Sequence, residues 1–201
     1  RPFFIKDHLK VLKYFRKWSS DKNHHVRRWV SEGSRPLLPW SLRLPVFVVD
    51  PKHTLPLLNQ LKFDDELYVR KSVANHLNDI SKHHPKIVID TLKDWEKKCS
   101  AKHLDKIKWI TRHSLRTLIK KGDARALKLM GVRGDAKVKL GDLKLQKNRI
   151  KLGDKLEFQF EMVSTAKVKQ KIVVDYLIYY MKSNGVAKPK TYKLKTIELM
   201  P

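Results

Sequence analysis

Hydrophobic residues recur at helical spacing through the first two thirds of the chain. Between residues 69 and 84, apolar residues three or four positions apart form one stripe: Val69, Val73, Leu77 and Ile80. Such a stripe is typical of a helix that buries one face. Polar residues fall on the other side of the same segment: Asn75, Asn78, Asp79 and Lys82. The pattern therefore predicts a helix with a core-facing side and an accessible polar side.

A different pattern, in which apolar and polar residues alternate, begins near residue 135. From 156 to 162 this alternation predicts a strand with its hydrophobic side chains on one face. Denser apolar runs predict two further strands, over 171–181 and 192–200. We therefore expect two domains, a helical one over residues 1–134 and a β domain over residues 135–201.

The helical part contains an internal repeat. Asp21 is followed five residues later by Val-Arg-Arg, Asp64 is followed in the same way by Val-Arg-Lys, and a weaker third copy surrounds Arg112. Periods of about 40–47 residues are typical of HEAT repeats, in which pairs of antiparallel helices stack into a curved solenoid. The fold class we expect is α plus β, with an α-solenoid of HEAT-like repeats first.

Net charge adds a function class to this architecture. Lysine and arginine number 45 against 20 acidic residues, which gives a net charge of +25. An excess of this size favours a polyanionic partner, nucleic acid before an anionic membrane surface. Apolar runs are too short to cross a bilayer, and the single cysteine excludes an intramolecular disulfide and favours a reducing, cytoplasmic setting.

Basic residues fall at matching points of successive repeats, so we expect them to line the inner surface of the solenoid and contact DNA phosphates. A row at i, i+4 and i+8 on one further helix is the clearest part of this signal: Arg112, Arg116 and Lys120. The full predicted set is Arg27, Arg28, Arg35, Arg70, Lys71, Arg112, His113, Arg116 and Lys120. The alternative is an ordinary solvated face.

Two segments carry candidate catalytic residues. In the first, Glu32 precedes Gly33, which we expect to end a helix in the left-handed conformation, and the following prolines hold Trp40 on a stiff loop. The alternative is that Glu32 pairs with Arg28 and that Trp40 is a core residue. In the second segment Asp79 stands beside two asparagines, and the alternative there is a hydrogen-bond network between repeats.

Metal and nucleotide chemistry find no support in the sequence. The nine histidines do not combine with cysteine or carboxylate at zinc-ligand spacing, and phosphate-binding glycine motifs are missing. From these residues we therefore expect neither a zinc site nor a nucleotide-binding fold.

Three long segments, 26–40, 68–80 and 109–118, resemble the AlkC branch of the AlkC/AlkD family of DNA alkylation-repair glycosylases. The resemblance covers residues 1–131 closely. Residues 135–201 resemble the Ig-like domain that many AlkC relatives carry, although only about four strands are recognisable where an Ig-like sandwich has about seven. A partial Ig-like β-sandwich is therefore the fold expected there.

The resemblance implies a C-shaped solenoid around duplex DNA and excision of cationic alkylated bases such as 3-methyladenine and 3-methylcytosine. It implies no metal or organic cofactor, and its active-site positions match Glu32, Asp79 and Trp40. Carboxylates suit this chemistry because they stabilise an oxocarbenium-like sugar and orient water. We expect both carboxylates to face one cavity with Trp40 as a wall.

Further expectations concern the state of the protein. The partner is expected to be double-stranded DNA containing alkylated bases, bound by a monomer in the bacterial cytoplasm at the nucleoid. The first residues resemble a motif from the middle of the family sequence, so we expect the family's N-terminal helices and last strands to lie outside this sequence. The competing hypothesis is a non-catalytic HEAT-repeat scaffold that binds DNA or an acidic protein.

Overall fold

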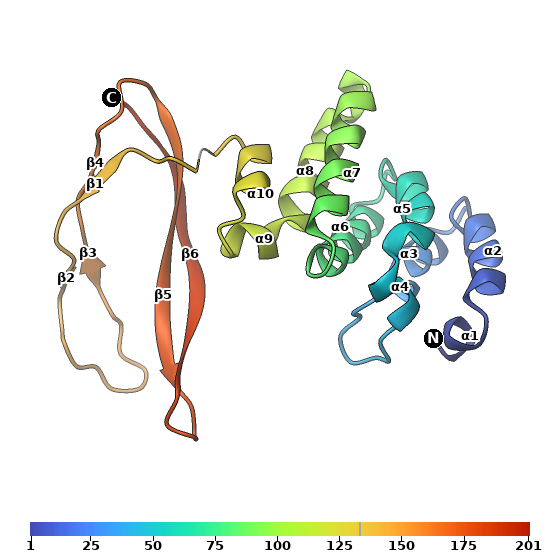
Figure 1. Cartoon of the computed structure of the whole chain (residues 1–201), viewed down its shortest axis with the longest axis horizontal. Coiled ribbons are helices and arrows are strands. Elements are labelled where there is room, and N and C mark those ends of the chain that lie inside the picture. Colours follow the sequence, from blue (N-terminus) through green and yellow to red (C-terminus); the bar gives the residue numbers. More distant parts are fainter. Residues whose placement is uncertain (133) are drawn as a thin grey trace. The chain divides into compact units, whose positions relative to one another are not determined.

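The computed structural model describes residues 1–132 and 134–201 and separates into two compact units. Unit 1 (Arg1–Ala126) is helical, and the regular structure of unit 2 (Leu127–Pro201) is mainly β-strand (Figure 1). The expected α plus β class is confirmed. The change of sequence pattern near residue 135 falls a few residues inside unit 2.

The helices of unit 1 follow one another through short connections, and their bounds are α1 (Pro2–Lys6), α2 (His8–Trp18), α3 (His24–Gly33), α4 (Pro45–Val49), α5 (Leu55–Leu61), α6 (Leu67–Ser81), α7 (Pro85–Lys98), α8 (Leu104–Ser114) and α9 (Arg116–Lys120). Two single 3-10 turns, η1 (Pro51–His53) and η2 (Ala101–His103), precede α5 and α8, and α10 (Ala124–Leu129) crosses the boundary between the units. Proline lies in the first turn of α1, α4, α5 and α7, where its missing N–H costs no helical hydrogen bond.

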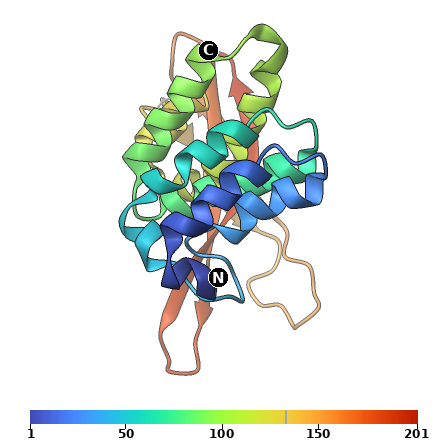
Figure 2. The same cartoon turned by 90° about the vertical axis from the view of Figure 1, so that its right-hand side faces the viewer.

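Helix α6 is the centre of unit 1, because α3, α5, α7, α8 and α9 all pack against it. Figure 2 views this unit with its N-terminal helices, drawn in blue, nearest the viewer. Val69, Val73 and Leu77 are fully buried, which confirms the predicted apolar stripe. The accessible polar side predicted for this helix is present only in part, because Lys82 is exposed and Asn75 half-buried. Asn78 and Asp79 are buried as well, since neighbouring helices cover α6 on more than one side.

The long helix expected around residues 109–120 is also interrupted. Helix α8 ends at Ser114, Leu115 has φ −85° and ψ 0°, and a separate short helix α9 begins at Arg116. The Ser114 hydroxyl donates to the carbonyl oxygen of Thr111, which helps to satisfy the helix end. Arg112 and Arg116 consequently stand on two helices, and the predicted row along one helix face is wrong.

The described residues of unit 2 form three antiparallel strand pairs. Strand β1 (Val138–Leu140) pairs with β4 (Met162–Ser164), β2 (Lys144–Leu145) with β3 (Phe158–Gln159), and β5 (Gln170–Met181) with β6 (Ala187–Leu199). The strand predicted over 156–162 is thus divided into β3 and the start of β4, whose partners differ. The prediction over 171–181 is confirmed, and β6 begins earlier than predicted.

Candidate active site

Glu32 lies in the last turn of α3, whose first turn is capped by the Asn23 side chain. The left-handed conformation expected at Gly33 is wrong, because this residue is the last one of the helix and the C-cap is Ser34 with φ −97°. Gly33 instead provides space. A Cβ atom there would lie 3.2 Å from Nε1 of Trp29 and 3.4 Å from the ring of Phe15.

The Glu32 carboxylate is held from three directions. Arg35 donates from Nη1 at 2.7 Å, the Ser72 hydroxyl of α6 donates at 2.7 Å, and Nη2 of Arg28 lies 3.6 Å away. The ion pair with Arg28 that was the alternative hypothesis is therefore present. It is one of several contacts, however, and the strongest donor is Arg35, which follows the helix.

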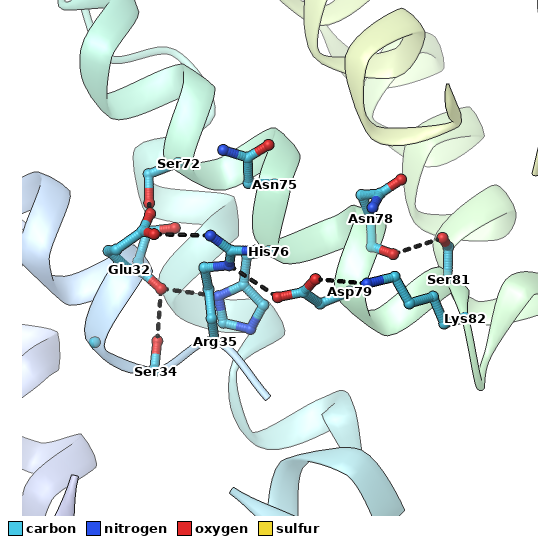
Figure 3. Close-up of polar contacts among 12 residues, drawn as sticks. Glu32, Ser34, Arg35, Ser72, Asn75, His76, Asn78, Asp79, Ser81 and Lys82 are labelled. Carbon is cyan, nitrogen blue, oxygen red and sulfur yellow. Dashed lines mark hydrogen bonds and ion pairs between the residues drawn. The ribbon is translucent and has the colours of Figure 1, made fainter. Parts of the chain in front are cut away.

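Asp79 is the second carboxylate of the same cluster (Figure 3). Its side chain is 2% exposed, accepts a hydrogen bond from Nε of Arg35 at 2.8 Å and lies 3.2 Å from Nζ of Lys82. One guanidinium therefore joins Glu32 of α3 to Asp79 of α6. The structure brings the two predicted carboxylates together through Arg35.

Burial and charge determine the protonation of this cluster. Burial alone would lower the pKa of Arg35, but the hydrogen bonds and charges of Asp79 and Glu32 outweigh it, so the pKa lies above the usual value. Burial lowers the pKa of the neighbouring His76 to about 3, so its ring is neutral. The Nδ1 atom of that ring contacts the carbonyl oxygen of Ser31 at 3.0 Å.

The two asparagines of the second segment connect α6 to α9. Arg116 donates from Nη2 to Oδ1 of Asn75 at 3.0 Å, and the Thr117 amide donates to Oδ1 of Asn78 at 3.3 Å. The hydrogen-bond network between repeats, which was the alternative hypothesis for this segment, is confirmed for both asparagines.

Trp40 stands on the loop between α3 and α4 with a fully exposed side chain. The alternative that it is a core residue is wrong. Its φ of 58° lies in the left-handed region, which a residue with a bulky side chain rarely adopts. Arg1 binds both ends of this loop, because its guanidinium donates to the carbonyl oxygens of Gly33, Arg35 and Leu42.

The indole ring of Trp40 packs against neither carboxylate, since it is exposed on all sides. Its predicted place in the wall of a cavity that contains Glu32 and Asp79 stays a prediction. The loop nevertheless starts from the same turn that carries Arg35, which links the position of the tryptophan to the carboxylate cluster.

Arg27 and Arg70, both predicted to contact DNA, are occupied by the chain itself. Arg27 makes a bidentate pair with Asp64 at 2.6 and 3.0 Å, and its Nη1 donates to the carbonyl oxygen of Asp21 at 2.8 Å. Arg70 repeats the second contact with the carbonyl oxygen of Asp64 at 2.6 Å. These contacts give both arginines a structural role.

The repeated aspartate has an equivalent role in each copy. Asp21 accepts from the Asn23 amide at 2.8 Å, and Asp64 accepts from the Glu66 amide at 3.0 Å. Sequence reasoning identified the repeat without this function. The constant spacing between the aspartate and the arginine could have indicated it, because two residues that hold the same loop must stand at a fixed distance along the chain.

Some of the remaining residues predicted to contact DNA are exposed, and others contact neighbouring aromatic rings. The exposed ones are Lys71, Arg112 and Lys120. The guanidinium of Arg28 lies over the ring of Tyr68 at 4.7 Å, and His113 stacks on Trp109 with ring centroids 4.9 Å apart. Burial lowers the pKa of His113, and the positive charges of Arg116 and Lys71 lower it further. The surroundings of His113 are therefore electropositive, and its imidazole is neutral.

The described part of the chain offers neither a cluster of metal ligands nor a membrane-spanning helix. Groups of three or more histidine, cysteine, aspartate or glutamate side chains close enough to hold a metal ion are missing from residues 1–132 and 134–201. Within the same ranges, every helix is too short or too polar to cross a membrane.

Known proteins share both units. A family model described as the C-terminal Ig-like domain of uncharacterised protein YhaZ matches residues 139–201. The chain is 43% identical over 194 residues to uncharacterized protein YhaZ of Bacillus subtilis (strain 168), an alignment that covers 96% of this chain and 52% of that protein.

A solved structure matches the whole chain. It is Pseudomonas fluorescens alkylpurine DNA glycosylase AlkC bound to DNA containing an abasic site analog, with a TM-score of 0.92 and 46% identity, and the match covers 100% of this chain and 54% of that one. The chain thus spans about half the length of the relatives it matches. The resemblance that the three segments indicated is confirmed: this chain has an AlkC-like fold, a helical region followed by an Ig-like domain.

Proposed function

We propose that this chain is the catalytic part of a DNA-repair glycosylase that hydrolyses the N-glycosidic bond of cationic N-alkylated bases in duplex DNA. The substrates proposed are 3-methyladenine and 3-methylcytosine. The single observation that carries the proposal is the pair formed by Glu32 and Asp79, which one arginine joins across two helices. The match to AlkC, whose structure contains DNA, supports DNA as the partner.

The chemistry needs little from the protein. An alkylated base that carries a positive charge is already a good leaving group, so the enzyme must stabilise the positive charge that develops on the sugar and place a water molecule. Glu32, whose side chain is 14% exposed, is suited to face the sugar. Asp79, which is 2% exposed, is suited to fix Arg35 and the water.

Trp40 adds a second source of recognition. An exposed indole held on a strained loop presents its face to whatever binds beside the carboxylates. Attraction between a cationic base and a tryptophan ring contributes about 0.5–2 kcal/mol. The ring would therefore favour a cationic base over its neutral parent.

The test is base release from methylated duplex DNA under single-turnover conditions. Glu32→Gln and Asp79→Asn keep the shape of each side chain and remove its charge, so each should slow base release by orders of magnitude while binding of an abasic-site duplex changes little. Asp90→Asn is the matched control, because Asp90 forms an exposed pair with Lys86 on α7. Release at the parent rate by both site variants would refute the proposal.

One observation favours a second candidate, a non-catalytic scaffold that binds DNA. Both carboxylates already have basic partners, so a purely structural network would look similar. The same assay separates the two candidates, because a scaffold binds methylated duplex and releases no base from it.

A further inference from the structure

We propose that Arg35 is a positioning residue that holds Glu32 and Asp79 at a fixed separation and keeps them directed at the sugar and at the attacking water. The proposal rests on the proposed glycosylase function and adds a role to it. Arg35 was predicted to contact DNA, yet its side chain is only 8% exposed and its charge faces two carboxylates. A buried guanidinium in this situation cannot neutralise a phosphate at the surface.

The two contacts use different edges of the guanidinium. Nη1 donates to Oε1 of Glu32 at 2.7 Å, whereas Nε donates to Oδ2 of Asp79 at 2.8 Å. Because the guanidinium is planar and rigid, the two bonds fix the direction of both carboxylates together. A lysine ammonium at this position keeps the charge but has no such fork.

The backbone of Arg35 is fixed as well. Its amide donates to the carbonyl oxygen of Glu32 at 3.3 Å, and its own carbonyl oxygen accepts from Nη2 of Arg1 at 2.9 Å. Pro36 follows directly, which restricts Arg35 to extended backbone angles. The side chain is therefore directed into the cluster by contacts that do not involve substrate.

Apart from Arg35, Glu32 has more hydrogen-bond and ion-pair partners than Asp79. Glu32 also has Arg28 and the Ser72 hydroxyl, so it keeps two partners if Arg35 is removed. Among the residues that the structure describes, Asp79 keeps one direct basic contact, Lys82, whose side chain is 39% exposed.

More distant positive charges do not replace Arg35 as a partner of Asp79. Arg1 and Arg116 lie near enough to be influenced by its charge, but they donate hydrogen bonds to other groups, and the ring of His76 is neutral. Loss of Arg35 should consequently affect Asp79 far more than Glu32.

The experiment compares the parent chain with Arg35→Lys and Arg35→Met in single-turnover base release from duplex DNA containing 3-methyladenine, and the affinity of each protein for abasic-site duplex is measured beside the rate. Methionine fills a similar volume but holds neither carboxylate in place, so the maximal rate for Arg35→Met should fall by roughly 10- to 100-fold while the affinity changes little, because the lost contacts orient groups that act in the transition state. Arg35→Lys keeps the charge without the fork and should recover part of the rate.

Arg43→Met is the matched control, because it removes an arginine charge from the same loop at an exposed position. It should leave the rate of base release close to that of the parent. A rate for Arg35→Met that is no lower than that of Arg43→Met overturns the proposal. A lower rate that lysine does not recover also overturns it, because packing alone would then explain the loss.

A double-mutant cycle in thermal unfolding separates this proposal from the function on which it rests. Arg35→Met and Asp79→Asn should be strongly non-additive, because each removes the same contact in the free protein. If the parent releases no base while this coupling is present, the proposed function fails and takes the positioning role with it. If the parent is active and the coupling is missing, only the role of Arg35 is refuted.

Discussion

His76 shows how strongly one buried residue can tie stability to pH. The ring is completely buried, its Nδ1 contacts the Ser31 carbonyl oxygen, and its pKa is lowered by burial from 6.5 to about 3. In the unfolded chain the same ring has a pKa of about 6.5, so it gains a proton as the pH falls below that value. Folding therefore requires a neutral His76.

The sign of the pH effect follows from this difference. The contribution of neutral His76 is fully present above pH 6.5 and is lost as the pH falls toward 3, because only the unfolded state binds the proton in that window. The parent should lose about 1.4 kcal/mol of unfolding free energy for each pH unit within that window.

A pair of variants isolates the contribution of His76. His76→Asn keeps a donor near Nδ1 and should flatten the pH dependence of urea unfolding, whereas the exposed control His83→Asn should leave the slope unchanged. Equal slopes for both variants would assign the pH dependence to other groups.

At the scale of elements, the pair between Arg27 and Asp64 joins α3 to the loop before α6. The Asp64 side chain is 5% exposed and the Arg27 side chain 19% exposed, so solvent screens the pair little. Burial alone would raise the pKa of Asp64, but hydrogen bonds from Arg27 and the Glu66 amide outweigh it and lower the pKa below 3.8.

Breaking this pair should destabilise the helical unit. Asp64→Asn should cost roughly 3 kcal/mol at pH 7, because Arg27 is left without its carboxylate. The difference from the parent should shrink as the pH falls below about 4, since the stabilisation from a carboxylate with a lowered pKa disappears when that group is protonated. Chemical denaturation at both pH values measures it. Asp65→Asn is the neighbouring control, because Asp65 is 98% exposed and should cost little.

The sequence predicts an element correctly where buried residues recur at a regular spacing. It predicts less where contacts between different repeats decide the structure. Val69, Val73 and Leu77 could be assigned to the core from spacing alone. The break at Leu115 could not, because the residues on both sides are compatible with a continuous helix and tertiary packing decides.

Prediction of the site shows the same division. Glu32, Asp79 and Trp40 were identified from local motifs, but the bridge through Arg35 depends on how two repeats stack, and residues 35 and 79 are 44 positions apart. The engagement of Arg27 by Asp64 was hidden for the same reason. The net charge indicates a polyanionic partner. It does not show which basic residues are held in contacts within the chain and which remain free to contact DNA.

At the scale of the whole molecule, the charge of +25 predicts DNA binding that weakens steeply with salt. Substitution of Lys71, Arg112 or Lys120 by alanine should weaken binding to damaged and undamaged duplex alike and reduce the slope of log affinity against log salt by about 1 each. Fluorescence anisotropy over a range of salt concentrations measures this slope.

The matched control for the salt experiment is Lys97→Ala, which removes an exposed lysine from α7 outside the predicted DNA-contacting set. It should leave the slope close to that of the parent. An affinity that does not depend on salt would remove the basis for the DNA-contacting face.

Trp40 has a consequence that reaches beyond binding. A left-handed backbone at a tryptophan costs of order 1 kcal/mol, and its fully exposed ring returns no packing energy in the free protein. Trp40→Gly should therefore raise the melting temperature by a few degrees in calorimetry. The same change should reduce base release if the ring takes part in recognition. Directed evolution for heat tolerance and directed evolution for repair would then choose opposite residues at position 40, so a thermostable descendant of this chain should be checked there first.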